Sequence, residues 1–286
     1  MFFRGCLGYG FYFLFSFVCV AVIPLFMLLF SWTPPARRQR IVEGVFRAFC
    51  HFLSRTYLPS LGIYRIVEES GFEILDTLGP AIIVANHRSR MDAPFLLPVL
   101  KNSAPVIKSN YARIPFYATL VRHLNFVSVS ANSLTSLFNS IQLCKQMLTL
   151  KKRLLIFPEG TRAAGCHTGE FKDLAFRLAI EADVPVLPIV VHTSLPFMAK
   201  VKGSVFPPFI FDVTIRALPP MRHTDAERPT HYAARVRKLI GAHLQQLDKG
   251  TPWEMPVFSP APARQFQYVK GVAPTAASNA AVKDVS

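Results

Sequence analysis

The sequence predicts an α/β domain with a mixed sheet flanked by helices, preceded by an N-terminal membrane-anchoring helix and an amphipathic interfacial helix. Three patterns predict this fold: a long uncharged apolar stretch, then a helical segment with one apolar face, and then short apolar runs that alternate with helical segments. The chain has 286 residues, of which 51% are hydrophobic. This fraction and a mean hydropathy of +0.31 exceed those of an ordinary soluble domain, so contact with a membrane is expected.

Charge and cysteine content narrow the classes of partner and cofactor. The net charge of +15 predicts an anionic partner surface, either lipid headgroups or nucleic acid. The basic residues are scattered among apolar segments without a zinc-ligand pair or an aromatic RNA-binding signature, so we expect membrane lipids and no nucleic acid. The five cysteines have no C-x-x-C spacing and predict neither a disulfide framework nor a metal site.

Residues 1–36 are the expected membrane anchor, since Arg4 is their only charged side chain. About 20 apolar residues suffice to cross a hydrocarbon core. A cleaved signal peptide is disfavoured because the stretch ends in Trp32, two prolines and the arginines of segment 37–40 rather than in a small-residue cleavage site. Those arginines outweigh Arg4, which places the bulk of the chain in the cytoplasm. Pro24 leaves a kinked or re-entrant helix open.

Residues 37–60 are expected to form the interfacial helix. Apolar residues recur on one face at Val42, Val45, Phe46, Phe49, Phe52 and Leu53. Glu43, Arg47, His51 and Arg55 lie on the other face. Such a basic amphipathic helix suits a membrane interface. A helix packed on the domain core explains the pattern equally well.

Residues 61–252 are expected to form the catalytic α/β domain. Strands are predicted at Ile63–Val67, Ala81–Ala85, Val106–Lys108, Phe126–Val129, Leu154–Phe157, Val186–Val191 and Phe209–Ile215. Helices are predicted over Leu134–Leu148, Phe171–Ala182 and Asp225–Leu247. A ligand crevice is expected at the carboxyl ends of the strands. Residues 253–286 lack either periodicity and are expected to form a flexible tail.

The stretch N-H-R-S-R-M-D (86–92) follows the expected strand at Ala81–Ala85 and contains the first candidate pair. His87 can take a proton from a hydroxyl, and Asp92 can fix the imidazole tautomer through the other ring nitrogen. An aspartate at this position is also an ordinary helix N-cap. Spacing alone favours the cap.

The stretch F-P-E-G-T-R (157–162) follows another strand and should reach the same rim of the sheet. Arg162 can grip a phosphate with two hydrogen bonds, and Glu159 can accept hydrogen bonds from a polyol. The alternative is a tight turn explained by Pro158 and Gly160, with Glu159 and Arg162 as a surface ion pair.

These two stretches resemble the conserved blocks of the glycerolipid acyltransferases typified by 1-acylglycerol-3-phosphate acyltransferase. N-H-R-S-R-M-D matches the N-H-x-x-x-x-D block and F-P-E-G-T-R the acceptor-binding block. V-P-V-L-P-I (184–189) is similar to the fourth block, and the resemblance covers about residues 60–220.

The resemblance implies direct acyl transfer without a cofactor, a metal or an acyl-enzyme. His87, oriented by Asp92, would deprotonate an acceptor hydroxyl, which attacks the thioester of acyl-CoA or acyl carrier protein. The implied acceptor is the lyso-lipid 1-acylglycerol-3-phosphate, and the product is phosphatidic acid. The implied acceptor-binding residues are Glu159, Gly160, Thr161 and Arg162.

The second block departs from the family pattern. Lys108–Ala131 contains I-P-F but no glycine and no arginine at the end of its strand, where the family grips the acceptor phosphate. The candidate auxiliary residues are Asn86, Lys108, Arg122 and Lys172. Losing one charge-assisted hydrogen bond costs about 1.5–3 kcal/mol, so a non-glycerophosphate acceptor such as lyso-ornithine lipid is the alternative. A non-catalytic membrane protein that retains the fold is a further alternative.

Overall fold

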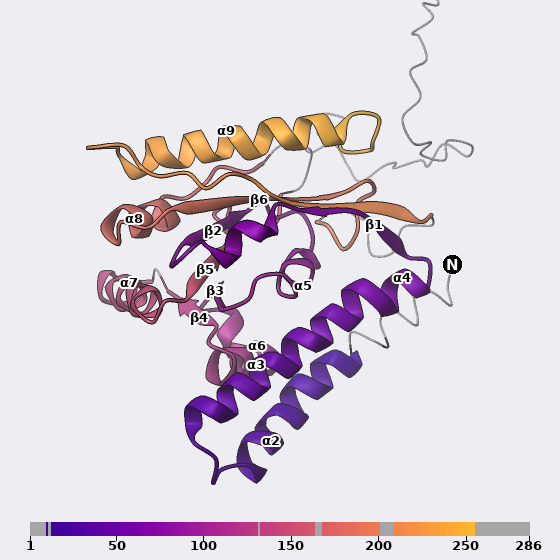
Figure 1. The fold of residues 1–286 in the computed structure, drawn as a ribbon, viewed down its shortest axis with the longest axis vertical. Coiled ribbons are helices and arrows are strands. Elements are labelled where there is room, and N and C mark those ends of the chain that lie inside the picture. The colour runs from indigo at the N-terminus through magenta and orange to yellow at the C-terminus, as the bar shows by residue number, and fades with distance from the viewer. Residues whose placement is uncertain (1–9, 11–12, 131, 164–167, 201–208, 255–286) are drawn as a thin grey trace, which may run out of the picture.

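A seven-stranded sheet forms the centre of the computed structural model, which describes residues 10, 13–130, 132–163, 168–200 and 209–254 (Figure 1). The strands are β1 (Tyr64–Ser70), β2 (Ile82–Ala85), β3 (Ser103–Lys108), β4 (Val127–Val129), β5 (Arg153–Ile156), β6 (Val186–Thr193) and β7 (Phe211–Ala217). Their order is β1-β7-β6-β2-β5-β3-β4. Neighbours pair in parallel except β6 and β7, which are antiparallel. The structure confirms the expected mixed sheet, with strand ends that differ from the predicted ones by a few residues.

Helices connect and cover the strands. They include α2 (Ile23–Leu29), α3 (Pro35–His51), α4 (Leu58–Ser60), α5 (Asp92–Leu96), α6 (Pro115–His123), α7 (Leu134–Thr149), α8 (Leu174–Glu181) and α9 (Pro229–Asp248). Short π-helical segments are η1 (Val18–Val22) and η2 (Phe52–Tyr57), and 3-10 segments are η3 (Phe72–Asp76) and η4 (Tyr111–Arg113). A capping box between Ser133 and Ser136 begins α7, and proline occupies the first turn of α3, α6 and α9. The three helices expected beyond residue 130 are therefore present.

The helices lie in two layers, one on each face of the sheet. Ile82 and Val84 of β2 pack in a cluster with α7, α8 and α9, whereas Ile83 and Ala85 pack in a second cluster with α3, α5 and α6. Figure 1 shows α8 and α9 on one side of the sheet and α3 and α5 on the other. Because both faces are covered, the central strands are continuous apolar runs in the sequence.

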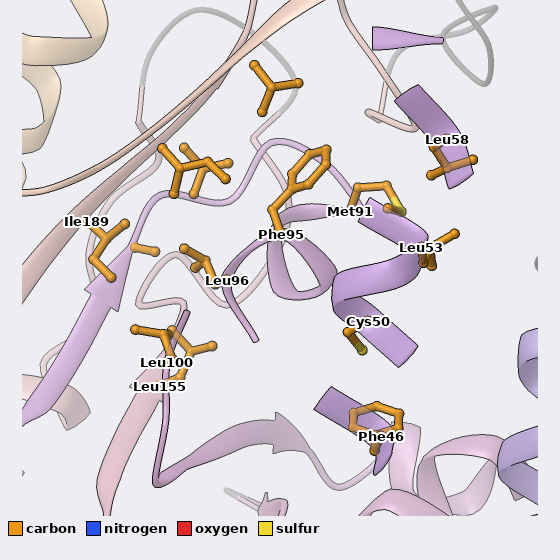
Figure 2. Close-up of a cluster of buried hydrophobic side chains, with 14 of the residues drawn as sticks. Phe46, Cys50, Leu53, Leu58, Met91, Phe95, Leu96, Leu100, Leu155 and Ile189 are labelled. Carbon is orange, nitrogen blue, oxygen red and sulfur yellow. The ribbon is translucent and has the colours of Figure 1, made fainter. Parts of the chain in front are cut away.

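A continuous helical segment occupies residues 35–60, as α3, η2 and α4 follow one another without a break. Its inner face is buried in the same cluster as Phe95 of α5, and Figure 2 shows Phe46, Cys50 and Leu53 following one another along this segment. Val45 and Phe52, which the periodicity places on the same apolar face, are 64% and 48% exposed. The helix is thus packed on the domain core and also presents apolar side chains outward.

The N-terminal helical segment, η1 and α2, lies along α3 (Figure 1). Phe15 is buried there, and its ring stacks on Phe49 with centroids 5.0 Å apart. Within the described part of the chain, no helix combines the length and the apolarity needed to cross a membrane. Residues 1–9 of the expected anchor lie outside the described residues, and the anchor at 1–36 stays a prediction.

The expected tail at 253–286 begins with a residue that packs on the domain. Trp253 is buried, and its indole Nε1 donates a 2.6 Å hydrogen bond to the carbonyl of Thr193. The packed chain therefore extends to Trp253. Residues 255–286 lie outside the described residues.

Candidate active site

The two candidate stretches are brought together by the pairing of β2 with β5. The strands run in parallel, with Ile82 opposite Leu154 and Val84 opposite Ile156. Their carboxyl ends therefore lie at the same edge of the sheet, and the loops that follow them, 86–91 and 157–163, lie side by side.

His87 and Asp92 are in direct contact at this edge. Nδ1 of His87 lies 2.8 Å from Oδ2 of Asp92, and the same oxygen accepts the backbone amides of Arg88 at 2.9 Å and Ser89 at 2.8 Å. Asp92 is the first residue of α5 and is only 1% exposed. Its partners lie before the helix rather than in its first turn, so the helix-cap interpretation is wrong. The Asp92 side chain instead binds the loop that contains His87.

This contact fixes the proton on one nitrogen of the imidazole. An ionised carboxylate can only accept, so Nδ1 of His87 carries the proton and Nε2 has the free lone pair of a base. The imidazole stacks on the ring of Phe157, with centroids 4.4 Å apart and planes 28° from parallel. Sequence reasoning assigned no role to Phe157, although it begins the second stretch. The ring is held on one edge by Asp92 and on one face by Phe157.

The backbone of His87 is held by the neighbouring loop. Its amide donates to Oε1 of Glu159 at 2.9 Å, and its carbonyl accepts the amide of Ala163 at 2.7 Å. The other oxygen of Glu159 accepts the amide of Gly169 at 2.9 Å. Burial raises the pKa of Glu159, and the two amide hydrogen bonds partly oppose that rise. The Glu159 carboxylate thus holds the loop that contains His87, and its expected contact with the acceptor stays a prediction.

The rest of F-P-E-G-T-R forms a tight turn that carries a cation at each side. Gly160 has φ +64°, a left-handed conformation that suits glycine, and a side chain there would meet Lys172 at 3.3 Å. The amide of Lys172 donates to the Pro158 carbonyl, so this auxiliary candidate lies beside the turn. Thr161 is exposed.

Arg162 is half-buried at the other side of the turn and donates from one guanidinium nitrogen to the carbonyl of Met198 at 2.8 Å. Burial lowers its pKa, and the charge of Arg90 lowers it further. The amide of Arg90 donates to the same Met198 carbonyl, at 3.2 Å. Arg90, which sequence reasoning did not single out, is thus an exposed cation close to Arg162. Its position inside the N-H-R-S-R-M-D stretch is the sequence feature that could have identified it as a site residue.

The remaining auxiliary candidates have different positions. Asn86 is fully buried, and its side chain exchanges two 2.8 Å hydrogen bonds with the backbone of Val191 in β6. Lys108 is the exposed last residue of β3, at the catalytic edge of the sheet. Arg122 is not brought to the site: it lies in the last turn of α6, which leads into the start of β4 at the opposite edge. A helix that crosses from one parallel strand to the next necessarily ends at the far edge.

The described residues contain no cluster of three or more His, Cys, Asp or Glu side chains that could hold a metal ion. Cys50 and Cys144 are free and buried, and burial raises the pKa of the Cys144 thiol to about 12. These thiols are not poised as nucleophiles. The candidate site consists of a histidine, the carboxylate that binds its ring and the cations around them.

Comparisons with known proteins agree with this geometry. Residues 66–192 match the family model for an acyltransferase. The chain is 27% identical over 185 residues to a putative 1-acyl-sn-glycerol-3-phosphate acyltransferase, acl-2, of Caenorhabditis elegans, with 64% of this chain and 60% of that protein covered. It is 31% identical over 130 residues to a probable 1-acyl-sn-glycerol-3-phosphate acyltransferase of Mycoplasma genitalium, with 43% and 48% covered. The chain thus spans less than two thirds of either relative.

The fold is similar to that of a solved structure, the 1-acyl-sn-glycerophosphate acyltransferase PlsC of Thermotoga maritima. The TM-score is 0.68 at 20% identity, over 86% of this chain and 97% of that one. The fold and the site define an α/β protein whose histidine–aspartate pair lies at the carboxyl edge of a mixed sheet. Residues 66–192 thus carry an acyltransferase domain, and the chain is similar to the glycerolipid acyltransferases typified by 1-acylglycerol-3-phosphate acyltransferase.

Proposed function

We propose that this protein transfers an acyl chain from acyl-CoA or acyl carrier protein to the free hydroxyl of 1-acylglycerol-3-phosphate, giving phosphatidic acid. The observation that carries the proposal is the 2.8 Å contact between His87 and Asp92, beside the F-P-E-G-T-R turn. The names of the relatives support the same acceptor.

In the proposed reaction, Nε2 of His87 takes the proton of the acceptor hydroxyl as the oxygen attacks the thioester carbonyl. The new C–O bond forms, the C–S bond breaks, and the imidazolium returns the proton to the leaving thiolate. Asp92 stays ionised and stabilises the imidazolium through Nδ1. The acceptor supplies the nucleophile, so no acyl-enzyme forms.

The acceptor phosphate would be bound by the cations around the turn. Arg162 keeps donors beyond the one used on Met198, and Lys172 lies next to Gly160. Arg90 would add a third charge. These residues would replace the arginine that the second block lacks. A phosphate-free lyso-lipid is the second candidate acceptor, because the described end of β4 reads V-S-V-S without a cation.

We place the protein at the cytoplasmic side of the inner membrane, with residues 1–36 as its anchor. Exposed apolar side chains on both N-terminal helices support contact with lipid. They include Phe13, Phe17, Leu25, Leu28, Trp32, Val45 and Phe52. The excess of arginine in segment 37–40 supports the cytoplasmic orientation.

The test is an acyl-transfer assay with the detergent-solubilised full chain. Labelled acyl-CoA and labelled acyl carrier protein are each offered with lysophosphatidic acid or with lyso-ornithine lipid. We expect transfer to lysophosphatidic acid and a loss of at least about 10³-fold in His87→Ala, since a base typically contributes up to about 10⁴-fold. His231→Ala, an exposed histidine on α9, is the matched control and should keep wild-type activity.

Two results would overturn the proposal. Near wild-type transfer by a folded His87→Ala variant would remove the base from the mechanism. Transfer to lyso-ornithine lipid alone would mean that the acceptor is not 1-acylglycerol-3-phosphate. The departure of the second block from the family pattern would then account for the different acceptor specificity.

A further inference from the structure

A buried ion pair joins the catalytic loop to the C-terminal end of the domain. Arg88, the residue after the proposed base, is 3% exposed, and Asp248, the last residue of α9, is 4% exposed. The two guanidinium nitrogens donate to the two carboxylate oxygens of Asp248 at 2.7 and 2.8 Å. Such paired, parallel hydrogen bonds fix orientation as well as distance.

Two further side chains complete this contact, which we call the C-terminal latch (Arg88, His192, Asp248 and Trp253). Nε2 of His192, at the end of β6, lies 3.2 Å from Oδ1 of Asp248. The guanidinium carbon of Arg88 lies 4.9 Å from the ring centroid of Trp253. The indole of Trp253 is itself anchored to the Thr193 carbonyl. The arginine is thus held by a carboxylate and by an aromatic face.

The position of Asp248 is unfavourable except as a partner for cations. A carboxylate at the C-terminus of a helix faces the negative end of the helix dipole. Burial raises the pKa of Asp248, but the nearby His192 and the hydrogen bonds from Arg88 outweigh burial and bring the pKa below its ordinary value. The carboxylate is therefore ionised at neutral pH, and the ion pair with Arg88 is maintained.

The latch acts on the atoms that orient the proposed base. The backbone amide of Arg88 is one of the two amides that bind Oδ2 of Asp92, the oxygen that holds Nδ1 of His87. The Arg88 side chain points away from this contact, into the latch. A displaced Arg88 side chain would therefore displace the amide, the Asp92 carboxylate and the imidazole together.

We propose that Arg88 and Asp248 are positioning residues, through which the end of α9 and Trp253 hold the His87–Asp92 pair in its reactive geometry. The inference rests on the proposed function for its kinetic readout. Under this inference the C-terminal end of the domain contributes to catalysis without touching the substrate, because the side chains of Arg88 and Asp248 are both buried.

The test compares the breaking of the ion pair with its apolar replacement. Asp248→Asn breaks the pair, whereas Arg88→Met combined with Asp248→Leu replaces it, a change that often restores stability to a buried site. Glu227→Gln is the matched control, because it breaks another two-bond pair, with Arg235, near the start of α9, whereas Asp248 is the last residue of that helix. Each variant is measured for kcat, for the acceptor KM and for its urea midpoint.

We expect Asp248→Asn to lower kcat between about tenfold and a hundredfold, the effect of a small misplacement of a catalytic group, with an acceptor KM close to wild type. The double apolar variant should recover the urea midpoint but not kcat, and Glu227→Gln should keep kcat. If the double variant recovered both the urea midpoint and kcat, the latch would only stabilise the fold, and the inference would be overturned. An unchanged kcat in Asp248→Asn would overturn it as well.

A second readout does not depend on acyl transfer, so failure of the proposed function can be distinguished from failure of the latch. Nitrogen NMR of the imidazoles, with His87→Gln to assign the signal, reports which ring nitrogen of His87 carries the proton. We expect the Nδ1-protonated form in the wild type and a mixture of tautomers in Asp248→Asn. An unchanged signal in Asp248→Asn would contradict the positioning role even if no transfer substrate were found.

Discussion

The carboxylate of Glu159 accepts one backbone amide from each side of the site, from His87 and from Gly169. The second of these contacts depends on the absence of a side chain at residue 169. A Cβ atom there would lie 2.8 Å from Oε2 of Glu159, closer than real Cβ atoms approach such an atom. Gly169 is therefore required by packing against a buried carboxylate.

Gly169→Ala is expected to push the Glu159 carboxylate away from the His87 amide. Overpacking typically costs about 1–3 kcal/mol, so the free energy of unfolding should fall by that amount and acyl transfer should fall with it. Gly79→Ala is the matched control, because a Cβ at Gly79 would meet nothing within 4 Å. Urea denaturation and the transfer assay measure both variants, and equal behaviour of the two would contradict the steric argument.

The sequence predicted the contacts of some single residues but not of others. His87 and Asp92 were correctly paired because both lie in one short stretch whose spacing permits the contact. The partners of Asp248 could not be predicted, since Arg88 is 160 residues away and no local pattern connects them. Arg122 was misplaced because the sequence does not say which edge of the sheet a helix end reaches.

At the scale of elements, the strands were predictable because those buried on both faces leave uninterrupted apolar runs. The helical segment at 35–60 was less predictable. Its buried stripe runs through Val42, Phe46, Cys50 and Leu53, whereas Val45 and Phe52 fall on the flank that the domain leaves uncovered. Periodicity alone does not define how wide a stripe the neighbouring elements will cover.

This uncovered flank should contact lipid. In a Trp32→Phe background, Phe52→Trp places a fluorophore on the flank, and Phe138→Trp places one on the exposed side of α7, where Phe138 is 60% exposed. Brominated lipids in reconstituted vesicles should quench the added fluorescence at residue 52 but not at residue 138, because an interfacial helix sits about 5–10 Å into the headgroup boundary. Equal quenching at both sites, relative to the parent, would exclude membrane contact by this flank.

At the scale of the whole molecule, the C-terminal latch makes stability depend on pH. The folded-state pKa of Asp248 is lowered, so its contribution to stability is fully present above the unfolded pKa of about 3.8 and is lost as pH falls through the lower folded value. Asp248→Asn lacks this contribution at every pH.

The wild type should therefore exceed Asp248→Asn in unfolding free energy at pH 7 by about 3 kcal/mol or more, the cost of breaking a buried pair from one side. The difference should shrink as the wild type is acidified below pH 3.8. Urea titrations of both proteins across this range measure it. A difference that stays constant with pH would mean that the charge of Asp248 does not stabilise the fold.

The pairing of β1 with β7 also determines when this chain can finish folding. Arg65 in β1 and Asp212 in β7 are ion-paired across 147 residues of sequence. During synthesis, the N-terminal helices and β1 leave the ribosome long before β7 exists, and contacts between distant segments form slowly. The apolar helices that precede β1 are thus available to a membrane before the sheet closes. For the proposed membrane-bound enzyme, this topology predicts that docking precedes catalytic competence.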